Sequence, residues 1–375
     1  MALQTDIIVR NFFRLILAGA FGQERQIEPM SAWKWKRLYH YSVINGVAAI
    51  VANGLSLCRN QFFAQQTGEM AETWQKAISQ TQEASRRQNM IAAELLGLYA
   101  HRQLRPILLQ GQALACLYVQ PDYRSPDEAI TIFFPFGTQG AKADDWAKEH
   151  GSDVDEQTKH VLMFRYQDIV VRHRHNLLQM ANALHNRALQ NIVQKEMRES
   201  APTFLQTCDT RVETLSPTLT LLHLLLSIAR SMLNAGVAAS QLVDLGLYLR
   251  KLGDRVDYVK LQDWLSAIGM QRMASLAGTM LIQMLDFSAD EIPFLTTRPE
   301  ASVVMAVTDD LFSLQKSRGG QWYFEQGDGI FVGTKHSSAM LWQVHHSARY
   351  ITYCPAESIS NFFSSFVHSL SHIEE

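Results

Sequence analysis

The fold is decided by a stretch between residues 104 and 119, which reads LRPILLQGQALACLYV. Residues 105–109 predict a short strand because they are apolar and end at a turn signal. Gly111 predicts a tight turn, and residues 112–119 predict a helix that begins directly after it. A strand, a glycine turn and a helix start form a common frame for binding phosphate through backbone amides. Gly111 is therefore a candidate ligand contact, although a turn without a ligand also explains it.

The residues that follow predict the rest of a small sheet. Residues 129–134 predict a second strand, residues 143–150 a short helix, and residues 161–172 a third strand. The acidic segment 152–156 is followed by polar residues without apolar alternation, which predicts a solvated loop. We therefore expect a small mixed sheet within residues 104–174.

Helical patterns dominate on both sides of this sheet. Apolar residues recur at helical spacing from residue 5 to about residue 101, with Ser31 as a helix cap and Gly54 as a break. Further helices are expected between residues 217 and 285. The sequence thus predicts an α+β protein whose small mixed sheet is flanked by largely helical regions. The expected regions are a helical N-terminal region (1–102), an α/β core (103–200), a helical C-terminal region (201–288) and a mostly helical extension (289–375) with its last helices at 337–351 and 355–372.

Composition argues against several classes of protein. The chain has 34 basic and 36 acidic side chains, for a net charge of -2, so no overall field attracts nucleic acid or anionic lipid. Nucleic-acid binding is therefore not expected. The cysteines are far apart and form no CxxC pair, so neither a zinc knuckle nor a disulfide framework is indicated. These cysteines are Cys58, Cys116, Cys208 and Cys354.

The longest apolar run does not predict a membrane span. Residues 219–233 include His223 and Arg230, and the run is shorter than the roughly 20 residues that cross a bilayer. We expect no membrane segment and a cytoplasmic location. His223 lies on the apolar face of the predicted helix, where a histidine is usually a satisfied core residue rather than a ligand.

One stretch resembles a known family. Residues 108–130, LLQGQALACLYVQPDYRSPDEAI, are similar to a family of uncharacterised nucleotidyltransferases found in many bacteria. In that family a lysine-glycine turn after a strand is followed by a helix and then by an arginine-containing GDxD segment. Further similar stretches occur in the family's order, with FFRL at 12–15, NRALQ at 186–190 and a helix entry at 236–244. The resemblance implies a nucleotidyltransferase-like core.

The resemblance also implies where the chemistry would lie. Nucleotidyl transfer uses carboxylates that hold two divalent ions, two of them at positions i and i+2 on one strand and a third on its neighbour. Here these positions fall on Glu128, Ile130 and Arg172. Gln110 stands where the family has the lysine of the turn, and Ser240 stands where it has an arginine before the Asp244 position. The resemblance therefore implies a centre that has largely lost its metal ligands, and we expect an ion pair between Glu128 and Arg172 where the metal would lie.

Two functions follow from this comparison. The first is a catalytically degenerate nucleotidyltransferase-like protein that needs no cofactor and binds a nucleotide or phosphate ligand or a protein partner. The second is an active, magnesium-dependent enzyme that transfers a nucleotidyl group to a sugar, a small molecule or a protein. Its metal ligands would be Glu128 with Asp127, or the pair Asp153 and Asp155 if these lie on a strand.

A third function is the binding of phosphate or nucleic acid without a metal. Arg124, Arg172 and Arg174, together with Gln110 and Gly111, are candidate substrate-binding residues, because arginine binds phosphate with two parallel hydrogen bonds. The alternative interpretation of these arginines is charge pairing with nearby carboxylates. The sequence leaves both interpretations open.

Overall fold

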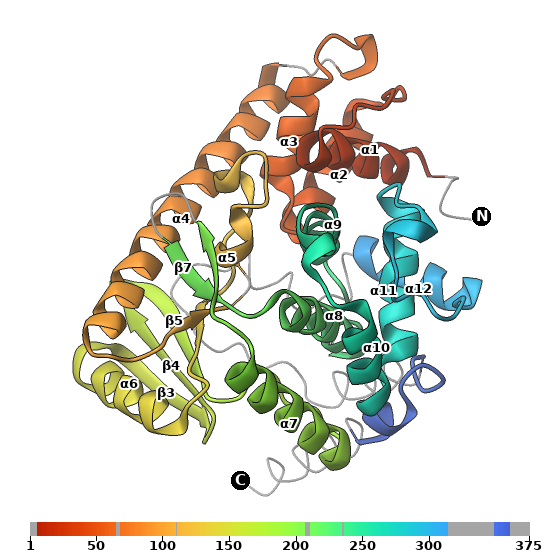
Figure 1. Ribbon diagram of the computed structural model, residues 1–375. Helices are drawn as coiled ribbons and strands as arrows, with labels where there is room; N and C mark the ends of the chain where they lie inside the picture. Colours follow the sequence, from red (N-terminus) through yellow and green to blue (C-terminus); the bar gives the residue numbers. More distant parts are fainter. Residues whose placement is uncertain are drawn as a thin grey trace, which may run out of the picture.

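The protein is built around a five-stranded mixed sheet that lies between a long helix and a group of C-terminal helices (Figure 1). This arrangement confirms the predicted α+β class and the predicted mixed sheet. The computed structural model describes residues 6–64, 68–109, 111–206, 211–234, 236–313 and 349–360.

The order of the strands in the main sheet is β1-β2-β5-β4-β3. Strands β2 and β5 are parallel, and the other neighbours are antiparallel. Thr131 of β2 is paired in register with Arg172 of β5, which aligns the residues that form the site below. The strands are β1 (Ile107–Leu108), β2 (Ile130–Phe133), β3 (Ser152–Thr158), β4 (Val161–Tyr166) and β5 (Ile169–Arg174), with β6 (Thr203–Gln206) and β7 (Arg211–Thr214) forming a separate pair.

Two predictions about this sheet are wrong. The single strand expected at 161–172 is a hairpin of β4 and β5, which turns at Gln167 and Asp168 with positive φ angles of 48° and 65°. The loop expected at 152–156 is the edge strand β3, whose residues are all exposed. A strand that is solvated on both faces has no apolar alternation, and so its sequence resembles that of a loop.

The N-terminal helices pack closely, as their periodicity predicted. The second helix begins after Ser31, as predicted, but the chain breaks at Gly46, where φ is +66°, and not at Gly54. Gly54 instead lies inside a helix, where an added Cβ would lie 2.1 Å from the Leu15 carbonyl oxygen of the facing helix. Glycine is thus used for close helix contact. These elements are α1 (Ile7–Phe21), α2 (Ala32–Ile44), α3 (Ala48–Leu57), η2 (Phe62–Ala64) and α4 (Gly68–His101).

The C-terminal helices share one apolar core with α1 to α3, and α8 lies at its centre. Of the helices in the described ranges, none is long and apolar enough to cross a membrane. The helices predicted at 337–351 and 355–372 fall largely outside the described residues, although residues 355–360 are helical. The remaining elements are α5 (Gln112–Ala115), η3 (Pro121–Tyr123), α6 (Gly137–His150), α7 (Ala183–Glu199), α8 (Pro217–Asn234), α9 (Ala239–Leu252), η4 (Gly253–Arg255), α10 (Tyr258–Ala267), α11 (Gln271–Met284), η5 (Ala289–Glu291) and α12 (Ala301–Phe312).

The two faces of the main sheet have different neighbours. One face, which we call the far face, packs against α4 and α6 through a second apolar core that includes Ile130 and Val171. The other, which we call the near face, is directed toward α8. The space between the near face and α8 holds the candidate site.

Candidate functional site

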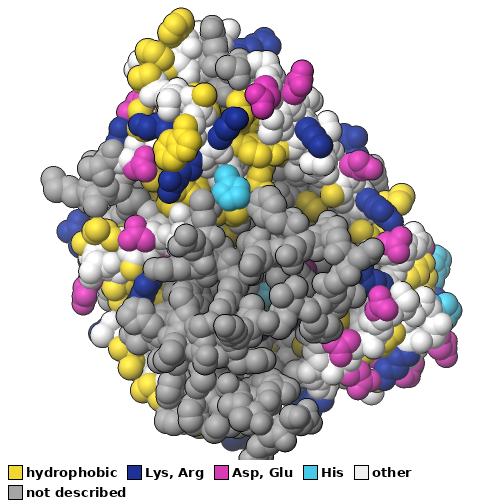
Figure 2. All heavy atoms as spheres, turned by 180° about the vertical axis from the view of Figure 1, so that it is seen from behind, with side chains coloured by type: hydrophobic (Ala, Val, Ile, Leu, Met, Phe, Trp, Pro, Cys, Tyr) yellow, Lys and Arg dark blue, Asp and Glu magenta, His cyan; other side chains and the backbone are white. Residues whose placement is uncertain are grey.

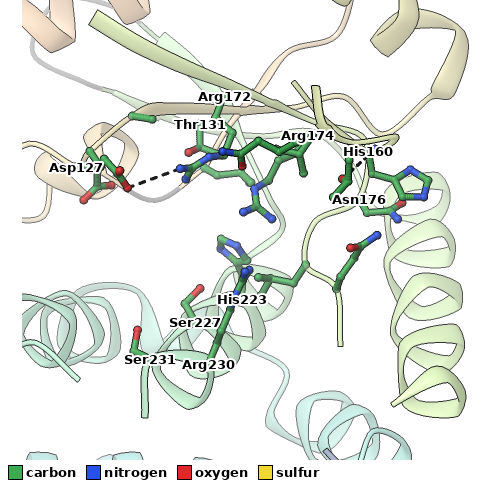
Figure 3. A pocket seen from close by; sticks show the side chains of 18 of the residues that line it. Asp127, Thr131, His160, Arg172, Arg174, Asn176, His223, Ser227, Arg230 and Ser231 are labelled. Carbon is green, nitrogen blue, oxygen red and sulfur yellow. Dashed lines mark hydrogen bonds and ion pairs between the residues drawn. The ribbon is translucent and has the colours of Figure 1, made fainter. Parts of the chain in front are cut away.

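A cavity of about 570 Å³ lies between the near face of the sheet and α8. Its walls come from β2 and the loop before it, from the turn between β3 and β4 with His160, from β5 and the chain that follows, and from one side of α8 (Figure 3). This volume is in the range of small-molecule sites, which span roughly 300–1,000 Å³. The lining is rich in polar and charged side chains.

Strand alternation decides which residues reach the cavity. Thr131 on β2 and Arg172 and Arg174 on β5 line it. Ile130 and His173 lie on the opposite face, buried against α4 and α6. The expectation that positions 128 and 130 face the same side is therefore wrong. Glu128 lines the cavity from the loop before β2, where strand alternation does not hold, whereas Ile130 is the first residue of β2 and points to the far face.

Arg174 and Arg230 face each other across the cavity, one from β5 and one from α8 (Figure 3). No carboxylate among the described residues forms an ion pair with either guanidinium. Burial, together with the charges of Arg230 and Arg172, lowers the pKa of Arg174 to about 10. Burial and the charge of Arg172 also lower the pKa of Arg230, although its side chain remains accessible to solvent. Within the described part of the chain, both arginines thus lack a counter-charge.

The predicted ion pair between Glu128 and Arg172 is present. Their closest charged atoms, Arg172 Nη2 and Glu128 Oε2, are 3.7 Å apart, and the Glu128 side chain is 62% exposed. An exposed pair at this distance is weak, typically worth no more than about 1 kcal/mol. Arg172 is therefore held only loosely and stays within reach of a ligand in the cavity.

Arg124 is placed differently from the other candidate arginines. It is buried outside the cavity lining, and its Nη2 donates to Asp244 Oδ2 at 2.8 Å and to Asp127 Oδ1 at 3.0 Å. Tyr118 donates to the same Asp244 carboxylate at 2.6 Å. Burial alone would lower the pKa of Arg124, but the carboxylates of Asp127 and Asp244 hold it well above the ordinary value. This network ties the loop before β2 to α9 and occupies one side of the Asp127 carboxylate.

Gly111 leaves room for the Asp127 carboxylate because it has no side chain. Its φ is +47°, and an added Cβ would lie 2.3 Å from Asp127 Oδ2, so only glycine fits here without displacing the carboxylate. The neighbouring Gln110 lies outside the described residues. The turn predicted at Gly111 is thus confirmed, while its role as a ligand contact stays a prediction.

One wall of the cavity was missed by sequence reasoning. His223, Ser227, Arg230 and Ser231 all project from α8 into the cavity (Figure 3). His223 was expected to be a satisfied core residue, but it is buried at the cavity wall, where burial and the charge of Arg174 lower its pKa to about 3. The signal was present in the sequence, because positions 223, 227, 230 and 231 form one polar stripe at helical spacing on an otherwise apolar helix.

Asp153 and Asp155 lie on a strand, but at the exposed edge of the sheet. Asp153 has a φ of +49° at an irregularity in β3, and its carboxylate is 3.2 Å from Arg165 Nε. Figure 2 shows that acidic side chains gather with basic ones at the corner that holds α6 and β3 (lower right). Neither aspartate lines the cavity.

The far face of β5 carries a fully paired polar network. His173 is buried between Tyr99, whose hydroxyl is 2.9 Å from Nε2, and Asp144, whose Oδ1 is 2.9 Å from Nδ1. His175 Nε2 lies 2.7 Å from the second Asp144 oxygen. Burial would raise the pKa of Asp144, but the hydrogen bonds from the two histidines hold it at about 2. An ionised Asp144 accepts from both rings, which leaves His173 Nε2 to accept from Tyr99.

The comparison with known families agrees with the fold. The model of a family described as uncharacterised nucleotidyltransferase matches residues 31–286, well over half of the chain. The chain belongs to this family. No curated protein and no solved structure matches it significantly.

Members of a nucleotidyltransferase family would be expected to hold divalent ions with carboxylates near the start of β2. In this chain the carboxylates that line the cavity are Asp127 and Glu128. Asp127 is ion-paired with Arg124 and Glu128 with Arg172. Over the described ranges, no group of three or more His, Cys, Asp or Glu side chains is arranged to hold a metal ion.

Proposed function

We propose that this member of the nucleotidyltransferase family binds a phosphorylated small molecule through arginines and without a metal, and that it does not perform two-metal nucleotidyl transfer. The observation that carries this proposal is the pair Arg174 and Arg230, which face one cavity and have no carboxylate partner among the residues that the structure describes. A guanidinium group that is partly desolvated and lacks a counter-ion favours an anion that brings the missing charge.

The positions where the family's chemistry would lie support the loss of metal binding. The residues that line the cavity here are Ala129, directly before β2, and Thr131 within it, and the partner of Thr131 on β5 is Arg172. None of these side chains is a carboxylate. The two nearby carboxylates already compensate arginines, so a divalent ion would have to compete with two guanidinium groups. This donor set does not fit a two-metal centre.

The test is calorimetric titration of the full chain with nucleoside triphosphates and with inorganic phosphate, in magnesium and in EDTA. We expect binding that is unchanged by EDTA and that weakens at least about tenfold in Arg174→Met and in Arg230→Met, because each removes a charged hydrogen-bond donor. Arg165→Met is the matched control, since Arg165 is an ion-paired arginine of β4 outside the cavity.

The opposite result would favour the active enzyme. The observation that favours this second function is that Asp127 and Glu128 line the same cavity. If binding required magnesium and turnover vanished in Asp127→Asn or Glu128→Gln, the proposal would be wrong. Loss of turnover in Asp153→Asn would instead point to the edge of the sheet.

A further inference from the structure

We propose that the ligand of this cavity is a phosphate monoester of a hydroxylated compound, such as a sugar or polyol phosphate, and not a nucleoside triphosphate. The inference rests on the proposed function and specifies the ligand of the same site. Three properties of the cavity carry it: its charge, the chemistry of its polar walls and the absence of large aromatic rings from its described lining.

The charge of the pair Arg174 and Arg230 matches a dianion. Glu128 compensates Arg172, and Arg124 is shared between two carboxylates, Asp127 and Asp244, so these groups carry one net negative charge and leave no positive charge uncompensated. Arg174 and Arg230 leave two positive charges without an ion-pair partner in the described structure. A phosphate monoester carries about -1.5 to -2 at pH 7, which two guanidinium groups neutralise. A nucleoside triphosphate without magnesium would bring more negative charge than this pair compensates.

The polar walls fit hydroxyl groups. Thr131 projects from β2, and Asn176 and Gln179 lie on the chain after β5, all of them lining the cavity. Hydroxyl and amide side chains both donate and accept hydrogen bonds, as sugar hydroxyls do. Ser231 on α8 accepts from Gln241 Nε2 at 2.9 Å, which leaves its own hydroxyl proton for a further acceptor. Such groups surround the arginines with partners for the rest of a hydroxylated ligand.

The walls offer little to a nucleobase. No Phe, Tyr or Trp is among the lining residues that the structure describes. Proteins that bind bases without sequence preference do so largely by stacking them on such rings. The apolar lining consists of small or aliphatic side chains, among them Leu109, Val161 and Leu178. The phosphate would thus lie between Arg174 and Arg230, and the hydroxylated part would lie along Thr131 and Asn176.

The test compares ligands on the full chain in EDTA by calorimetry. The probes are hexose, pentose and glycerol phosphates, inorganic phosphate, and ATP without magnesium. We expect the best sugar or polyol phosphate to bind at least about tenfold more tightly than inorganic phosphate and than ATP. Asn176→Ala should weaken binding of that ester several-fold and leave inorganic phosphate unchanged, because Asn176 would contact only the hydroxylated part.

Each outcome separates this inference from the proposed function. If ATP or inorganic phosphate binds as tightly as every ester, and Arg174→Met abolishes that binding, the ligand class is wrong while anion binding by the arginines stands. If no anion binds, or if Arg174→Met and Arg230→Met bind like Arg165→Met, the proposed function itself is wrong. Circular dichroism of each variant shows whether a loss of binding reflects unfolding.

Discussion

Strand β5 presents His173 to the far face of the sheet and Arg174 to the near face, and the two neighbours have opposite surroundings. His173 has a partner on each ring nitrogen, Tyr99 and Asp144. Within the described structure Arg174 has no ion-pair partner, and it faces Arg230 across a cavity. Polar groups buried for structure are normally paired, whereas an unpaired cation in a cavity calls for an external partner. The comparison therefore separates the side of the sheet that stabilises the fold from the side that is available for function.

The largest expected effect lies on the far face. His173→Ala would leave the Tyr99 hydroxyl and one Asp144 oxygen without partners in the protein interior. We expect the free energy of unfolding, measured in urea, to fall by about 3 kcal/mol, the usual cost of stranding buried polar groups. His101→Ala, at the exposed end of α4, is the control and should change stability by less than about 0.5 kcal/mol. Equal stabilities for the two variants would contradict a structural role for the network.

The second prediction concerns pH and a near-face residue. His223 has a pKa of about 3 in the folded protein, below the roughly 6.5 of an unfolded chain. Between these values the unfolded state binds a proton that the folded state does not, so stability falls as the pH drops. We expect His223→Gln to lose less stability than the wild type between pH 6.5 and 4.5, by up to about 1.4 kcal/mol per pH unit.

Asp144 does not obscure this measurement. Its folded pKa of about 2 is below the unfolded value of about 3.9, so its contribution is fully present above that value and is lost only toward pH 2. Burial also lowers the pKa of His173 and of His160, and both act in the same direction as His223. The decisive quantity is therefore the difference between wild type and variant, and parallel curves would show that His223 is not held neutral.

The third prediction is that a substitution on the near face raises the free energy of unfolding, whereas His173→Ala on the far face lowers it. Arg174→Met removes a partly desolvated cation that has no counter-charge among the described residues, and so should raise stability by about 1 kcal/mol while it weakens anion binding. Unfolding in urea and phosphate titration of the same sample measure the two effects. Arg165→Met should show neither, because Arg165 is paired at the exposed sheet edge. A loss of stability in Arg174→Met would indicate that Arg174 is a structural residue.

The sequence predicted the helical regions well because their apolar residues recur at helical spacing, as in α8 and α9. It predicted the turn at Gly111 because glycine marks such turns. The β4–β5 hairpin was missed because its turn uses Gln167 and Asp168 instead of the glycine or asparagine usual at positive φ. Strand β3 was missed because both of its faces are solvated.

The site was predictable only in part. The Glu128–Arg172 pair was found because the resemblance placed both residues near one centre, and the structure confirms it. The prediction that Glu128 and Ile130 face the same side was wrong because the strand begins only at Ile130, and the sequence does not show that Glu128 lies in the loop before it. Arg230 was missed because it lies on a helix 58 positions after Arg172, and only the fold brings α8 against the sheet.

The smallest expected effect on stability best distinguishes a metal-free anion site from a magnesium-dependent active site. Glu128 is exposed and only weakly paired with Arg172, so Glu128→Gln should barely change stability. It would, however, release Arg172 to join Arg174 and Arg230, and affinity for inorganic phosphate in EDTA should rise about two- to fivefold. Removing a metal ligand has the opposite consequence, because magnesium-dependent binding would fall. The direction of change in this single variant thus shows whether the carboxylate restrains an arginine or holds a cation.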